Sequence, residues 1–242
     1  MESRHLTRVS GRRIACLPGR GRRIACLLGT CGLLVGGVGP VVLLTAGSAS
    51  AAACGTATAA GTPCTMTGTL ILSSGTLTLT APSALGWAAN VAGLDQNLVD
   101  PTAAHQSYLI DDATGTGAGW HVTVSATTFT SGSLTLADAG TFSSNGSVTS
   151  ITAATAPTTT CSGGSTCTPP TNTTTYPVAI TTAASAPTAV NVYDTSAGTG
   201  KGSIVIGGSA TANPVGWWLN VPSNTLAGTY SSTVTMEIIA GP

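Results

Sequence analysis

The chain has 242 residues, 7% of them charged and 4% aromatic, and its formal net charge is zero. This neutrality hides an asymmetry, because seven of the eight Lys and Arg residues lie in the first 23 positions. From Cys54 onward Lys201 is the only basic residue beside seven acids, which gives a net charge of −6. Such a segment cannot neutralise a run of phosphates, so nucleic-acid binding and docking on an anionic membrane surface are excluded.

Residues 1–53 have the order of a secretory signal peptide: a basic start, an apolar Gly-rich run and then small residues. We expect cleavage near Ala51 or Ala53, secretion, and no stable membrane insertion after cleavage. Two alternatives stay open. The apolar run over residues 24–44 is long enough to span a bilayer, and Ala51-Ala52-Ala53-Cys54 resembles a lipoprotein cleavage box that would place a lipid on Cys54.

Four cysteines follow the leader: Cys54, Cys64, Cys161 and Cys167. An even count in an exported chain indicates disulfides. Three connectivities are open, and the local ones, Cys54 with Cys64 and Cys161 with Cys167, close small loops. These spacings do not fit a zinc knuckle and no histidine lies nearby, so we expect no metal there.

The composition of residues 54–242 predicts a single all-β domain. Thr supplies 40 of these 189 positions, whereas Glu, Lys, Arg, Gln and Met are nearly absent. We therefore expect an antiparallel β-sandwich of short Thr-rich strands, with little or no helix outside the signal peptide. The Pro-containing tract over residues 153–176 is expected to be a long excursion between strands, pinned by a disulfide.

Alternating apolar residues predict individual strands and their faces. Leu70 and Leu72 are expected to form a hairpin with Leu77 and Leu79 about a turn at Ser74-Gly75. Further strands are predicted where the alternation recurs, and the apolar residues on their inner faces are Trp120, Val122, Trp217, Leu219, Tyr230, Val234, Met236 and Ile238.

Three residues fall on the opposite parity from this predicted core: His121, Trp218 and Asn220. Parity alone places Trp218 on a polar outer face of the sandwich. The alternative is that a loop covers this face and buries the ring, because alternation cannot report the layer above a strand.

Two Gly-rich loops begin at an aspartate, Asp112 in one and Asp194 in the other. Each carboxylate is expected to cap its turn. Binding of Ca²⁺ is the alternative, although neither loop has the dense carboxylates of an EF-hand loop.

The residues that catalysis needs are scarce. There is no G-x-S-x-G, H-E-x-x-H, phosphate-loop or dinucleotide motif. Asp111 and Asp112 are adjacent, so on a strand they point to opposite faces and cannot flank one glycosidic bond. We expect a non-enzymatic protein with no catalytic residues, metal or cofactor.

The segments around two of the predicted strands resemble the signature blocks of WxL-domain proteins. In the first, the loop over residues 111–119 ends in Gly119 and opens the strand Trp120-His121-Val122; the second is the closing run over residues 227–242. The family's Trp-x-Leu is replaced by Trp120-x-Val122 in the first block and by Met236-x-Ile238 in the last. Only Trp217-Trp218-Leu219 contains the motif literally.

This resemblance implies an exported Gram-positive surface module that attaches noncovalently to the cell wall through peptidoglycan or another wall glycan. Trp218, Asn220 and His121 are the candidate glycan-binding residues, since a ring can stack on a sugar face while an amide binds its hydroxyls. The alternative function is a structural surface-layer or adhesin component that assembles with itself or with other surface proteins through edge strands.

Overall fold

The computed structural model describes residues 52–54, 59–61, 63–136 and 141–242. The chain divides into two compact units, Met1–Thr67 and Gly68–Pro242. The predicted signal peptide lies, up to residue 51, outside the described residues. In the first unit β1 (Ala52–Ala53) pairs in parallel with β2 (Cys64–Thr65). Disulfides are confirmed, and of the three connectivities that the sequence leaves open Cys54 bonds to Cys64. The predicted domain start at residue 54 stays a prediction.

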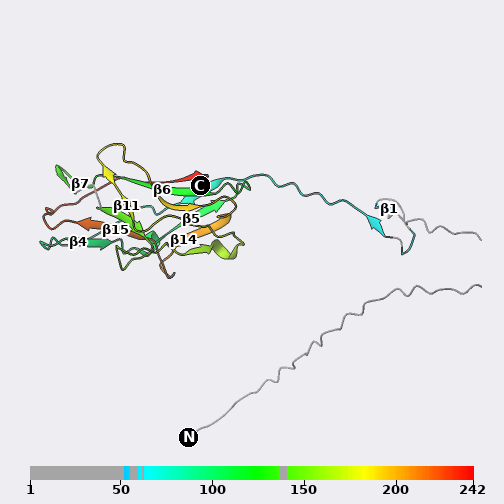
Figure 1. Ribbon diagram of the computed structural model, residues 1–242, viewed down its shortest axis with the longest axis horizontal. Helices are drawn as coiled ribbons and strands as arrows, with labels where there is room; N and C mark the ends of the chain where they lie inside the picture. The colour runs from blue at the N-terminus through cyan, green and yellow to red at the C-terminus, as the bar shows by residue number, and fades with distance from the viewer. Residues whose placement is uncertain (1–51, 55–58, 62, 137–140) are drawn as a thin grey trace, which may run out of the picture. The chain divides into compact units, whose positions relative to one another are not determined.

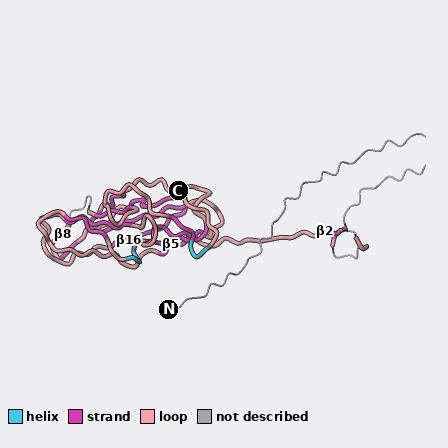
Figure 2. Tube along the Cα trace, turned by 90° about the horizontal axis from the view of Figure 1, so that it is seen from below, coloured by secondary structure: helices cyan, strands magenta, loops and turns pink. Residues whose placement is uncertain are grey.

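The second unit is built of strands, and its described helix is confined to the short 3-10 turns η1 (Ala103–His105) and η2 (Ser162–Gly164) (Figure 2). Neither turn is long enough to cross a bilayer, and the described residues contain no other helix. The strands of this unit are β3 (Leu77–Thr80), β4 (Gln96–Val99), β5 (Ser107–Asp112), β6 (Trp120–Thr127), β7 (Thr130–Ser131), β8 (Leu134–Thr135), β9 (Phe142–Asn145), β10 (Thr159–Cys161), β11 (Val178–Ile180), β12 (Thr182–Ala183), β13 (Val190–Thr195), β14 (Gly202–Gly207), β15 (Gly216–Val221) and β16 (Val234–Ala240) (Figure 1).

These strands form three four-stranded sheets, with β7 and β8 as a separate hairpin. One sheet has the order β10-β14-β5-β3 and the second β11-β9-β15-β4; in the third, β6 pairs with β16 and with β12 and β13. All pairings in the three sheets are antiparallel except that of β12 with β6. The predicted antiparallel all-β sandwich is therefore confirmed.

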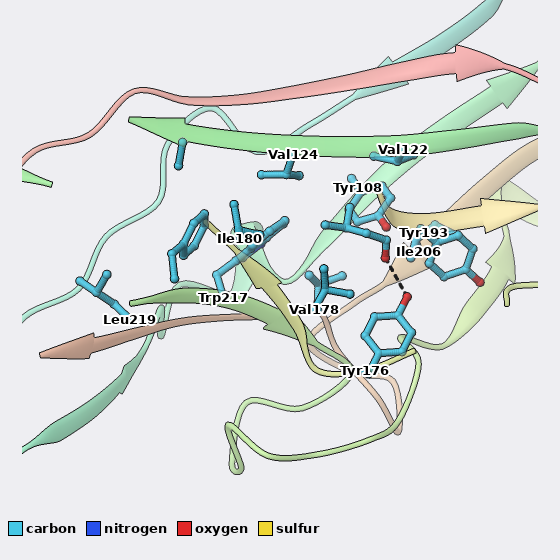
Figure 3. Packing of buried hydrophobic residues seen from close by; sticks show 14 of the residues in the cluster. Tyr108, Val122, Val124, Tyr176, Val178, Ile180, Tyr193, Ile206, Trp217 and Leu219 are labelled. Atoms are coloured by element: carbon cyan, nitrogen blue, oxygen red, sulfur yellow. Dashed lines mark hydrogen bonds between the residues drawn. The ribbon is translucent and has the colours of Figure 1, made fainter. Parts of the chain in front are cut away.

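The core lies between β6 and the strands opposite it. Val122 and Val124 point from β6 toward Val178, Ile180 and Trp217, which come from β11 and β15 (Figure 3). The predicted inner faces are confirmed: Trp120, Val122, Trp217 and Leu219 are buried, and Tyr230, Val234, Met236 and Ile238 are partly buried against the same cluster.

The predicted hairpin about Ser74-Gly75 is wrong. Residues 70–72 form no strand, and β3 pairs instead with β5, from Leu77 opposite Asp112 to Thr80 opposite Leu109. The local turn signal failed because a partner some thirty residues away offers a six-residue strand in the core of a sheet, whereas a short isolated hairpin is marginal in water.

The excursion over residues 153–176 is fastened at several points besides the disulfide of Cys161 with Cys167, which completes the local connectivity. The Asp194 carboxylate accepts hydrogen bonds from the Thr173 backbone N–H and hydroxyl, both at 2.6 Å. The Tyr176 hydroxyl donates to Val192 O at 2.8 Å. Asp194 thus caps this excursion rather than its own loop, whereas Asp112 caps its own turn through the Thr114 N–H and hydroxyl as expected.

Trp120 connects the core to a glycine loop. Its indole N–H donates to Gly200 O at 2.7 Å, and its ring stacks on Tyr193 with centroids 6.1 Å apart. Gly200 has φ +66°, and a Cβ at this position would lie 2.6 Å from Thr195 Cγ2 and 2.8 Å from Trp120 Nε1. Gly200 is needed for its positive φ and for the close approach of the tryptophan ring.

Gly200→Ala should destabilise the domain by about 3 kcal/mol, because left-handed strain and a steric clash with Trp120 add together. Gly198→Ala is the matched control, since Gly198 also has positive φ (+86°) but has open space where a Cβ would lie; it should cost about 1 kcal/mol. Urea denaturation of both variants measures the difference. Equal losses would contradict a steric role for position 200.

Candidate functional site

Trp218 is not the exposed aromatic that its parity predicted. The ring has 5% relative exposure, and its indole N–H donates to Asn145 Oδ1 at 3.1 Å and to Ser147 O at 2.9 Å. Asn145 is the last residue of β9 and Ser147 lies in the segment that follows it, so the end of this strand and the following segment cover the outer face of β15. The loop-covered alternative is therefore confirmed, and Trp218 has no free face for a sugar.

The other two candidates lie apart from each other. Asn220, on β15, donates through Nδ2 to Asn97 Oδ1 on the neighbouring strand β4 at 2.8 Å. His121 lies on β6, in a different sheet, with Nδ1 2.8 Å from Gly241 O. Because both side chains have the opposite parity from the core, they stand on opposite outer faces of the sandwich. A sugar-binding role for either residue stays a prediction.

The described part of the chain contains an apolar groove of about 870 Å³. It is lined by residues 81–91 and 225–234 and by side chains of the core cluster: Val124, Phe129, Leu136, Trp217, Leu219 and Met236. Leu226 stands at its rim with 61% exposure. A smaller hollow of about 320 Å³ adjoins the groove and shares Leu136, Thr225, Leu226 and Tyr230 with it.

Trp217 holds one side of this groove in place. Its carbonyl oxygen accepts the indole N–H of Trp87 at 3.0 Å and the backbone N–H of Asp100 at 2.9 Å. Its own indole N–H donates to His105 O at 3.0 Å, and its ring stacks on Phe142. Trp87 packs edge-on against Phe129 and Phe142. One β15 residue thereby fixes the segment 81–91 and the turn η1.

A buried carboxylate fastens the same segment a second time. Asp100 is almost fully buried and accepts hydrogen bonds from the backbone N–H groups of Gly86 and Thr102, each at 2.8 Å, and it lies 2.7 Å from His105 Nδ1. Burial alone would raise the pKa of this carboxyl, but the hydrogen bonds from Thr102, Gly86 and His105 outweigh it and hold the pKa below its ordinary value.

The groove has no charged lining residue. Its polar groups are hydroxyls and amides, and the hydroxyls of Ser83, Thr225 and Thr229 make no hydrogen bond to other described residues. A charged ligand would lose its hydration here without gaining a counter-charge. The groove is thus suited to a neutral ligand with both apolar faces and hydroxyl or amide groups.

Titratable side chains elsewhere do not gather into a reactive site. No three His, Cys, Asp or Glu side chains form a metal-ligating cluster among the described residues. Burial raises the pKa of Tyr108, Tyr176 and Tyr193, so these phenols stay protonated, and those of Tyr176 and Tyr193 make hydrogen bonds within the core.

Sequence reasoning missed Trp87 and the segment 81–91, and it predicted Tyr230 and Val234 of the other lining segment only as core residues. Residues 81–91 contain large apolar side chains without the alternation of a strand, so no periodic signal marks them. One signal was available: the segment lies in a stretch without any charged residue, from position 24 to position 94. Large apolar residues in such a loop indicate contact with the core or with a ligand.

Comparison with known proteins identifies one family. Residues 73–242 match the model of the WxL domain, described as surface cell wall-binding, over about seven-tenths of the chain. The match spans β3 to β16 and includes every residue that lines the groove. No curated protein and no solved structure gives a significant match.

Asp100→Ala should destabilise the domain by about 3 kcal/mol at pH 7, because three donors lose a buried charged acceptor. Since the folded state lowers the pKa of Asp100, its contribution is present at neutral pH and is lost as the pH falls below about 4. Wild type should therefore lose more stability between pH 7 and pH 3 than the variant does.

Urea denaturation at the two pH values measures this effect. Glu237→Gln is the control, because Glu237 is exposed on β16 and the variant should match wild type. If Asp100→Ala and wild type showed the same loss of stability on acidification, the carboxylate would not be the group that titrates.

Proposed function

The chain belongs to the WxL domain family, and we propose that it attaches to the wall through the groove, with a neutral glycan strand of peptidoglycan as ligand. The family's domain is surface cell wall-binding, so this is a surface protein that attaches to the cell wall. The proposal adds the site, the ligand class and a non-enzymatic mode of action, in which the predicted leader exports the chain and is removed.

The observation that carries the proposal is an uncharged apolar groove whose rim offers free hydroxyls. Sugars present apolar C–H faces and rings of hydroxyl groups, and N-acetyl sugars add a neutral amide. Leu226 and the partly buried ring of Tyr230 offer apolar surface to the sugar faces, while Thr225 and Thr229 offer hydroxyls. The adjoining hollow extends the groove past Leu226, which suits a polymer better than a single sugar.

The loop over residues 225–232, which forms the rim of the groove around Leu226, is held in place by hydrogen bonds. The Tyr230 hydroxyl donates to Leu226 O at 3.0 Å, which closes a compact turn over the intervening residues. At the far end of the loop the Ser232 hydroxyl donates to Thr127 O on β6. A loop that is ordered before the ligand arrives loses less conformational entropy on binding, which favours a noncovalent attachment.

Leu226→Asp should weaken binding to purified peptidoglycan at least tenfold, or about 1.4 kcal/mol, because it removes an apolar contact and places a charge at a neutral rim. The measurement is co-sedimentation of the exported protein with purified wall at increasing wall concentration. Ile239→Asp is the matched control: Ile239 is 37% exposed on β16, outside the groove, and its variant should bind as wild type does. Equal binding by both variants would remove the groove from the site.

Wall binding should also persist in about 1 M NaCl, because salt screens charge–charge attraction but leaves burial of apolar surface intact. The same sedimentation, repeated from low to high salt, tests this. A steep fall in bound protein with salt would instead indicate an ionic wall polymer as the partner.

A further inference from the structure

A short segment just before β3 exposes its apolar side chains. In this extension, residues 68–75, the relative exposures of Leu70, Ile71 and Leu72 are 80%, 85% and 82%. All three precede the region matched by the family model, which begins at residue 73. Three consecutive large aliphatic residues at this exposure call for a partner, since isolated exposed residues are common but contiguous ones are not.

The backbone of the extension is unpaired over most of its length. β3 pairs with β5 as far as Leu77 opposite Asp112, and the Gly75 N–H donates to Ala113 O at 2.8 Å. Residues 68–74 have no strand partner among the described residues. At about 3.3 Å per residue these seven residues extend roughly 23 Å, longer than a typical strand of five or six residues.

The features that normally protect a free strand are missing from the extension. The sequence has no charged residue between positions 24 and 94 and no proline between Pro63 and Pro82. Exposed edges are usually protected by lysine, proline or a bulge. Apolar side chains also occupy both faces, Leu70 and Leu72 on one and Ile71 on the other, a pattern typical of strands that are paired and covered.

We propose that residues 68–74 of the extension pair in antiparallel fashion with the same residues of a second copy, centred on Ile71. The residue types are nearly symmetric about this position. Pairing places Ile71 opposite Ile71, Leu70 opposite Leu72 and Thr69 opposite Ser73. Apolar side chains therefore lie opposite apolar side chains, and hydroxyl groups lie opposite hydroxyl groups. Such self-complementarity is what a two-fold symmetric interface requires.

Charge also favours a second copy at this segment. From Cys54 onward each chain carries a net charge of −6, so two copies repel each other over most of their surface. The acids nearest to it in the sheet are Asp111 and Asp112, which lie opposite Thr78 and Leu77 just beyond the extension, and none lies in the extension itself. The extension is therefore a place where two copies meet without apposing like charges.

Dimerisation would place two grooves in one assembly. Two sites on one particle bind a polymeric wall with higher apparent affinity than a single site does, because the second contact is intramolecular. This consequence rests on the proposed function, whereas the pairing itself does not.

Sedimentation velocity of the exported chain over a range of concentrations tests the pairing. Wild type should dimerise, and Ile71→Lys should raise the dimer dissociation constant at least tenfold, since two lysines would face each other across the two-fold axis. Leu94→Lys is the matched control, because Leu94 is 71% exposed outside the extension and its variant should dimerise as wild type does. A wild type that stays monomeric up to about 100 μM, or an equally dimeric Ile71→Lys, overturns the proposal.

Cross-linking tests the register. Directly opposed residues in an antiparallel pair have Cα atoms about 4.5–5.5 Å apart, within the range of a disulfide. Ile71→Cys should therefore form an intermolecular disulfide, mapped to residue 71 by mass spectrometry, at least ten times faster than Leu94→Cys. Equal rates would overturn pairing about Ile71, as would a wild type that enters a larger complex only when other wall proteins are added.

Wall sedimentation separates the failure of this inference from that of the proposed function. Leu226→Asp should still dimerise while losing wall binding, whereas Ile71→Lys should keep an intact groove and bind the wall with lower apparent affinity. If monomeric Ile71→Lys bound the wall as tightly as wild type, the avidity step would be wrong.

Discussion

The constraint on which this structure depends is that a buried indole N–H must find an acceptor. The chain has four tryptophans, and each donates to a carbonyl oxygen of a distant segment: Trp87 to Trp217, Trp120 to Gly200, Trp217 to His105 and Trp218 to Ser147. Leaving such a donor unsatisfied costs about 1–3 kcal/mol. Each ring therefore fixes the position of a loop as well as filling space. In a domain with little helix and one lysine, these indole hydrogen bonds hold loops in place, as helix caps and ion pairs do in other proteins.

The groove is a consequence of that constraint. Trp217 lines the groove, and the two hydrogen bonds accepted by its carbonyl place Trp87 and Asp100 beside it, so the segment 81–91 follows a path set by β15. Asp100, which directly follows β4, then accepts a hydrogen bond from the Gly86 N–H and fixes the same segment a second time. The hydrogen bonds from Trp87 to Trp217 and from Gly86 to Asp100 are partly buried, so they position the segment 81–91 without a ligand. Apolar side chains of the core therefore stay accessible in the groove. A noncovalent wall anchor benefits from such a preformed surface, since ordering it on binding would reduce the affinity.

Alternation predicted the strands whose partners cover one face, and it failed where the decisive contact comes from elsewhere in the chain. Trp120 and Trp217 point inward because their neighbours at two-residue spacing are apolar, which the sequence displays directly. Trp218 has the polar parity and is nonetheless buried, because the segment around Ser147 covers it, and no local pattern reports a covering loop. The prediction of a hairpin at Ser74-Gly75 failed for a related reason. β3 pairs with β5, and turn residues carry no information on a strand partner that is distant in the sequence. The groove was missed because its lining comes from segments more than a hundred residues apart.

The distribution of charge connects attachment with specificity. Seven acids and one lysine follow Cys54, yet neither the groove nor the extension carries any charge. An acidic body is repelled by anionic wall polymers, so attraction must come from its neutral surfaces, and a wall component that lacks a neutral face gains nothing to offset the repulsion. Specificity of this kind arises as much from disfavouring the wrong ligand as from fitting the right one. The same distribution acts between copies of the chain, because net charge keeps the folded bodies apart and leaves the uncharged extension as the place where they can approach.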